Sequence, residues 1–197
     1  MARRSFSSLS LQDALELVPA QEVKRWHMDT EDRAPSDILL ANLERLESFA
    51  VQTSEPARVF VIDLMLSEIA HRYPRIRIWK GEPLTSGSVG GVADFLIAPR
   101  RAYVETPLLC VIEAKRDNFV EGEVQCIAEM ATCRDNNARD GKDITVHGIV
   151  SNGLGWVFYK LTQTPEVLVS RFYSWDDLPK LLGALDHVIA ACADNIP

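Results

Sequence analysis

An unbroken apolar run from Leu108 to Ile112 restricts the fold of this chain more than any other feature of the sequence. Such a run is typical of a strand that is buried on both faces of a sheet. Side chains alternate along a strand, so Glu113 and Lys115 share one face, while Ile112 and Ala114 point the other way. Buried charges cost free energy unless a metal ion or an opposite charge lies beside them. The run therefore predicts a central strand that ends either in a charged site or in an ordinary ion pair.

The pattern of apolar residues divides the rest of the chain into helices and strands. Residue spacing near 3.6, with Ser36, Ser54, Asn118 and Ser174 as N-caps, predicts helices at 11–18, 20–26, 36–49, 54–71, 118–134 and 174–189. Alternation predicts strands at 75–79, 93–98, 108–115, 144–151, 155–161 and 167–173. Asn152-Gly153 joins two of these strands and is a strong hairpin signal. These elements predict an α/β fold with a central mixed sheet flanked by helices.

The composition predicts one compact unit. The chain has 197 residues, of which 47% are hydrophobic and 25% are charged, which is enough for one sizeable core. We divide it into an N-terminal helical extension, residues 1–53, and a main segment, residues 54–197, with an additional C-terminal helix. Because no apolar stretch approaches the roughly 18 residues that span a bilayer, we expect no membrane association. The first residues lack the apolar run of a signal peptide, so we expect a cytoplasmic protein.

Cysteine spacing and net charge exclude some classes of site. The four cysteines show no C-x-x-C spacing, which favours reduced, packed thiols over disulfides or zinc. The formal net charge of −7 argues against a protein that coats nucleic acid without specificity, although it allows a local basic groove. Basic residues occur around Trp79 and in the following loop, where they could contact phosphate or form a solvated strand edge; they are Arg75, Arg77, Lys80, Arg100 and Arg101.

Asp94 is the natural companion of Glu113. It lies on the preceding predicted strand, after a glycine-rich stretch that lets a backbone or a substrate approach closely. If the two strands are neighbours, their carboxylates can lie close enough to hold one cation. Oxygen ligands of this kind suit Mg²⁺ or Mn²⁺, which keep several waters and complete their shell with phosphate oxygen.

The segment Gly91-Val92-Ala93-Asp94, followed by Val111-Ile112-Glu113-Ala114-Lys115, resembles the signature of the PD-(D/E)XK nuclease superfamily, whose members are restriction-endonuclease-like. The resemblance covers roughly residues 54–161 and implies an αβββαβ core. It implies that Asp94, Glu113 and the carbonyl of Ala114 hold Mg²⁺ or Mn²⁺, and that Lys115 positions the attacking water. It further implies products with 5′-phosphate and 3′-hydroxyl ends.

Two further site residues follow from the resemblance. Gln125 would belong to the branch of the superfamily in which a Gln-bearing helix follows the lysine, and would orient the site or touch phosphate. Glu68 is our candidate for an acid supplied by the first core helix, and could also serve as a metal ligand. Asp63 and Glu82 are alternatives to it. The chain departs from the pattern at Ala93, where many members carry proline, and at Glu129, where the Gln-helix branch carries tyrosine.

The expected function is hydrolysis of phosphodiester bonds in nucleic acid, with DNA as the expected substrate, by a metal-dependent nuclease. The alternative is a catalytically inactive module that keeps the same core for nucleic-acid binding, protein binding or assembly. A homodimer is compatible with double-strand cleavage, but no feature of the sequence requires it.

Overall fold

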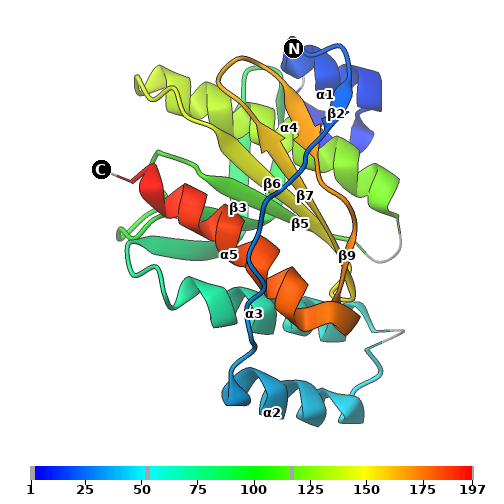
Figure 1. Cartoon of the computed structure of the whole chain (residues 1–197). Helices are drawn as coiled ribbons and strands as arrows, with labels where there is room; N and C mark the ends of the chain where they lie inside the picture. Colours follow the sequence, from blue (N-terminus) through cyan, green and yellow to red (C-terminus); the bar gives the residue numbers. More distant parts are fainter. Residues whose placement is uncertain (1–2, 52–53, 116–117, 197) are drawn as a thin grey trace.

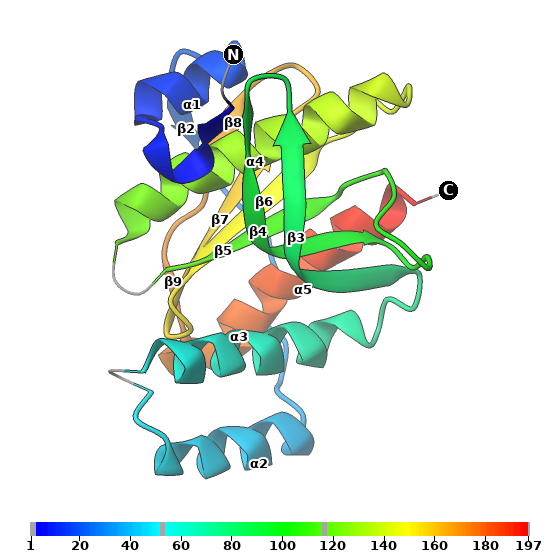
Figure 2. The ribbon, with the colours of Figure 1, turned by 180° about the vertical axis from the view of Figure 1, so that it is seen from behind.

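The computed structural model describes residues 3–51, 54–115 and 118–196 (Figure 1). In these ranges the strands form a 9-stranded mixed sheet in the order β1-β4-β5-β6-β7-β8-β2, with β3 paired to β4 and β9 paired to β7. Helices flank the sheet on both faces (Figures 1 and 2). The predicted α/β class with a central mixed sheet flanked by helices is therefore confirmed.

The elements have the following bounds. The strands are β1 (Arg4–Ser5), β2 (Val23–Arg25), β3 (Ile76–Ser86), β4 (Val89–Pro99), β5 (Cys110–Ala114), β6 (Val146–Ser151), β7 (Gly155–Leu161), β8 (Val167–Val169) and β9 (Tyr173–Ser174). The α-helices are α1 (Leu11–Leu17), α2 (Asp37–Arg45), α3 (Glu55–Ala70), α4 (Phe119–Arg139) and α5 (Leu178–Asp194). Short 3₁₀ turns are η1 (Phe6–Ser8), η2 (Leu46–Ser48) and η3 (Trp175–Asp177).

Most local predictions from the sequence agree with these elements. The side chains of Ser36, Ser54 and Asn118 cap α2, α3 and α4. Asn152-Gly153 lies in the β6–β7 turn, where Gly153 has a φ of +84° and Asn152 Oδ1 accepts hydrogen bonds from the amides of Leu154 and Gly155. The helix predicted at 20–26 is wrong, because residues 23–25 pair with β8 as a strand.

The sheet separates two hydrophobic layers. On one face, α3 and α5 cover apolar side chains of β4, β5, β6 and β7, including Phe95, Ile112 and Phe158. On the other face, α4 covers Leu96, Val111 and further residues of the same strands. Successive residues of β5 thus enter opposite layers, as the alternation of side chains requires. This arrangement places Glu113 in the layer beneath α4.

The β3–β4 hairpin extends beyond the central sheet and lies against α4 (Figure 2). At its tip, Ser86 Oγ donates to Asp135 and accepts from Arg139, and Asn136 donates to the carbonyl of Thr85. Gly81, whose φ of +66° favours glycine, interrupts the regular β3–β4 pairing at the position opposite Asp94. Gly81 therefore allows the β3–β4 hairpin to bend at the position opposite Asp94.

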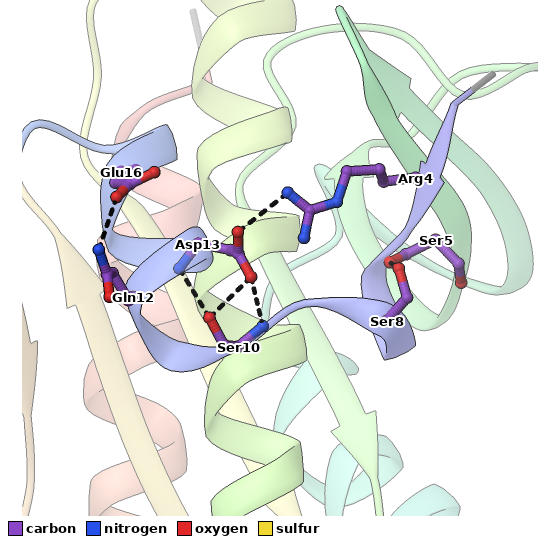
Figure 3. Close-up of polar contacts among 7 residues, drawn as sticks. All are labelled: Arg4, Ser5, Ser8, Ser10, Gln12, Asp13 and Glu16. Carbon is purple, nitrogen blue, oxygen red and sulfur yellow. Dashed lines mark hydrogen bonds and ion pairs between the residues drawn. The ribbon is translucent and has the colours of Figure 1, made fainter. Parts of the chain in front are cut away.

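The N-terminal extension contributes to both ends of the sheet. β1 pairs in parallel with β4, and β2 pairs in parallel with β8. Between them, Ser10 and Asp13 form a capping box at the start of α1, and Arg4 forms an ion pair with Asp13 at 2.9 Å (Figure 3). Phe6 is buried against Gly91, where an added Cβ would lie 2.7 Å from its ring. The extension is thus packed into the same core as the strands of the candidate site.

After β2 the chain crosses the outer side of α5 and reaches α2, which packs on α3 (Figure 1). Arg33 secures this crossing: its amide donates to the carbonyl of Pro179, and its guanidinium lies 2.6 Å from Asp186. Tyr73 donates to the same carboxylate at 2.9 Å. None of the helices in the described ranges is long and apolar enough to span a lipid bilayer.

Candidate active site

Asp94 and Glu113 lie on paired antiparallel strands. The β4–β5 register places Phe95 opposite Ile112, so Asp94, one residue before Phe95, and Glu113, one residue after Ile112, come next to each other across the two strands. Asp94 Oδ2 accepts a hydrogen bond of 2.9 Å from the amide of Ala114. At this point of the β4–β5 pair the Ala114 amide thus donates to the Asp94 side chain and not to a main-chain carbonyl. This bond fixes one carboxylate oxygen of Asp94 against the end of β5.

Glu113 and Lys115 project from β5 into the layer beneath α4. Glu113 is 3% exposed, and its Oε1 lies 2.6 Å from Lys115 Nζ, whose side chain is 23% exposed. Gly122 of α4 allows the helix to come close: a Cβ there would lie 2.5 Å from Val150 and 3.1 Å from Lys115 Cγ. Because Lys115 is more exposed than Glu113, its ammonium group lies between the buried Glu113 carboxylate and the solvent.

Two opposing effects act on Glu113. Burial raises the pKa of its carboxyl group, and the negative charge of Asp94 raises it further, whereas Lys115 lowers it. The ion pair with Lys115 thus offsets part of the cost of burying this carboxylate between a sheet and a helix.

Glu129 on α4 is a member of the cluster that the sequence analysis did not assign to the site. It is 0% exposed, and burial raises the pKa of its carboxyl group well above the ordinary value, as do Glu113 and Asp94. Within the described residues, neither of its carboxyl oxygens has a hydrogen-bond partner of regular geometry. The sequence carried one signal for it, since Glu129 is a single acid within the otherwise uncharged run from Cys126 to Cys133.

The chemistry of these residues fits a hard divalent cation. Asp94, Glu113 and the carbonyl of Ala114 offer oxygen ligands of the kind that Mg²⁺ and Mn²⁺ prefer. Among the residues described, no three His, Cys, Asp or Glu side chains are arranged to hold a metal ion directly. A donor set of two carboxylates and one carbonyl does not need a third such side chain, because Mg²⁺ keeps several waters in its shell.

Gln125 lies one helical turn before Glu129, on the same side of α4. It is half-buried and lines a hollow of about 280 Å³, together with Phe6, Leu9 and Val124. Its amide forms no side-chain hydrogen bond within the described part of the chain. Gln125 is thus available for a contact with a bound molecule.

Glu68, the acid expected from the first core helix, faces α2 instead. Its two carboxylate oxygens accept hydrogen bonds from the amide and the hydroxyl of Ser36, both at 2.8 Å. Because α2 lies on the side of α3 remote from the sheet, the structure does not bring Glu68 together with Asp94 and Glu113 (Figure 2). Of the two alternatives to Glu68, Asp63 forms an ion pair with Lys80 at 2.8 Å. Glu82 is a residue of β3 and lies opposite Ala93 of β4.

The basic residues around Trp79 mostly have intramolecular partners. Arg75 donates to the carbonyls of Ala193 and Ile196 and so caps the end of α5. Arg77 donates to the carbonyl of Arg101 and lies over the ring of Trp79. These contacts give both arginines structural roles.

The comparisons with known proteins add no family to this geometry. A scan of the chain against protein-family models gives no match, and a search of curated proteins gives no match either.

Proposed function

We propose that this protein is a Mg²⁺-dependent nuclease with a site of the PD-(D/E)XK type. The observation that carries the proposal is the grouping of Asp94, in the middle of β4, with Glu113 and Lys115 at the end of the paired strand β5, beneath α4. The element order α3-β3-β4-β5-α4-β6 also agrees with the αβββαβ core that the resemblance implies. An isolated Glu-x-Lys pair on a strand would carry little weight, because such ion pairs are common on sheets.

Each residue has a distinct task in the proposed reaction. Asp94, Glu113 and the Ala114 carbonyl would hold the cation, and the hydrogen bond from the Ala114 amide keeps Asp94 in place for this. The bound cation supplies Lewis-acid stabilisation of the phosphoryl oxygen and lowers the pKa of a coordinated water. Lys115 would orient the attacking water and offset the negative charge that develops on the phosphate.

The proposed substrate is nucleic acid, with DNA as the first choice, and the expected products carry 5′-phosphate and 3′-hydroxyl ends. Gln125 would contact the phosphate backbone from α4, where its amide group has no partner within the described residues.

The test is incubation with supercoiled plasmid, linear duplex, single-stranded DNA and RNA in the presence of Mg²⁺ or Mn²⁺. We expect metal-dependent cleavage that EDTA abolishes. Glu113→Gln and Lys115→Ala should each lower the cleavage rate by at least about 10²-fold, the usual effect of removing one group that stabilises the transition state.

Glu166→Gln is the matched control, since it removes an exposed carboxylate that is paired with Lys24 on the surface. It should cleave at the rate of the parent protein. Cleavage that survives in both Glu113→Gln and Lys115→Ala would reject the proposed site. Binding of nucleic acid without cleavage under any of these conditions would favour the inactive module instead.

A further inference from the structure

We infer that Glu129 is a third carboxylate of the cation site, which acts through a water molecule of the ion's shell and strengthens cation binding. The inference rests on the proposed nuclease function and extends it to a residue outside the (D/E)-x-K motif.

The first reason is the unusual surroundings of the Glu129 side chain. It is fully buried on α4, and within the described residues neither Oε1 nor Oε2 has a hydrogen-bond partner of regular geometry; the polar group that interacts with it there is another carboxyl group, that of Glu113. A buried carboxyl group without a well-placed donor is costly, and such groups are rare in folded proteins. Its neighbours on the helix, Cys126 and Met130, are themselves buried and offer no strong donor. Packing alone therefore does not account for an acid at this position.

The second reason is the direction in which this carboxyl group points. Glu129 is fully buried on a helix that packs on β5, and the charged groups close enough to act on its carboxyl group are Glu113, Asp94 and Lys115, so this group lies on the side of the candidate site. Glu129 follows Gln125 by one turn and thus extends the same side of α4 along the site. The helix supplies one carboxyl group to a cluster whose other members come from β4 and β5.

The third reason is the balance of charge. Asp94, Glu113 and Glu129 are three acids, and Lys115 supplies one positive charge to them. When all three are ionised, the surplus of negative charge equals the charge of one divalent cation. A bound Mg²⁺ or Mn²⁺ would accordingly make the buried cluster neutral, which is the condition under which buried charges are best tolerated.

A contact through water reconciles this role with the geometry. The side chains described do not include three acids that converge on one point, so Glu129 is not placed as a direct ligand beside Asp94 and Glu113. Mg²⁺ gives up its waters reluctantly, and carboxylates that hydrogen-bond to such waters contribute to affinity. Loss of a partner of this outer kind commonly weakens metal binding by about 10–100-fold.

The experiment measures metal binding without substrate, so that its outcome does not depend on cleavage. Thermal unfolding and isothermal titration calorimetry are carried out with Mn²⁺ and with Mg²⁺ on the parent protein, Glu129→Gln and Glu129→Met. Glu121→Gln is the matched control, because Glu121 is an exposed acid on the first turn of the same helix.

We expect the cations to raise the Tm of the parent protein and of Glu121→Gln. Glu129→Gln and Glu129→Met should be at least as stable as the parent in metal-free buffer, because each removes one of three clustered acids. Their apparent Kd for Mn²⁺ should be about 10–100-fold weaker. The methionine variant fills a similar volume with an apolar side chain. It serves as the test if the buried amide group of Glu129→Gln destabilises the fold.

Two results would overturn the inference, and they are distinguishable. If the parent binds the cations and both Glu129 variants bind them as tightly, Glu129 has no part in the site and the nuclease proposal stands. If neither cation binds the parent protein, the nuclease proposal fails together with the inference.

Discussion

At the scale of single residues, two kinds of buried polar side chain can be compared among the described residues. Asn137 and Ser151 satisfy main-chain groups: Asn137 bonds both the amide and the carbonyl of Leu108, and Ser151 bonds the amide of Gly153 and the carbonyl of Gly155. Glu113 and Glu129 instead face other charged side chains. The first kind serves the stability of the fold, whereas under the proposed function the second kind would serve cation binding.

Asn137→Ala tests the first kind. The change leaves the amide and the carbonyl of Leu108 buried without partners just before β5, at a cost of roughly 2–4 kcal/mol in the free energy of unfolding. The Tm should fall by several degrees, measured by circular dichroism. Asn136→Ala is the control, because the Asn136 side chain is less buried than that of Asn137 and makes two longer hydrogen bonds, donating to the carbonyl of Thr85 and accepting from Arg139, both at 3.2 Å. Equal Tm values for the two variants would contradict the role given to Asn137.

At the scale of elements, close approaches between main chains determine where the helices lie. Gly122 lets α4 approach β6, and Gly183 lets residues 31–32 cross α5. A Cβ at position 183 would lie 2.1 Å from the carbonyl oxygen of Glu31, a main-chain atom that cannot rotate away. The position therefore requires glycine even though glycine is a poor helix former.

Gly183→Ala should consequently destabilise the protein, although alanine by itself would favour the helix by about 1 kcal/mol. We expect a lower Tm and faster proteolysis within residues 26–35, because the crossing segment must move away from α5. Ala190→Gly, at a half-buried position of the same helix, measures mainly the propensity effect. A Gly183→Ala variant that is more stable than the parent would show that the crossing segment adapts without cost.

At the scale of the whole molecule, the extension and the main segment share one sheet. β1 and β2 extend the sheet at its two ends, and Phe6 and Val18 lie in the same hydrophobic layer as Leu96 and Val111. Segments that share a core and a sheet are expected to unfold together.

We therefore expect a single cooperative transition in urea, with coincident curves from circular dichroism and from tryptophan fluorescence. Trp26, which lies just after β2 and near His147 of β6, should report the same midpoint as the fully buried Trp156. The chain has four tryptophans, so variants that retain either Trp26 or Trp156 as the single tryptophan can separate the signals. An earlier transition for Trp26 would show that the extension unfolds on its own.

The sequence by itself determined the features that depend on residues close together in the chain. Strand alternation placed Glu113 and Lys115 on one face, local caps began α2, α3 and α4, and Asn152-Gly153 formed the turn between β6 and β7. The position of Asp94 beside Glu113 could also be predicted, because consecutive strands with a short connection usually pair.

Tertiary structure decided the features that depend on which surfaces meet. Glu68 lies on the side of α3 that receives Ser36 and α2, and Glu129 lies on the side of α4 that meets the sheet. The three residues of β2 become a strand only because β8 offers an edge to pair with. Local patterns give the type of an element, but long-range packing selects its exposed face and its partners, so the composition of the acidic cluster could not be read from sequence alone.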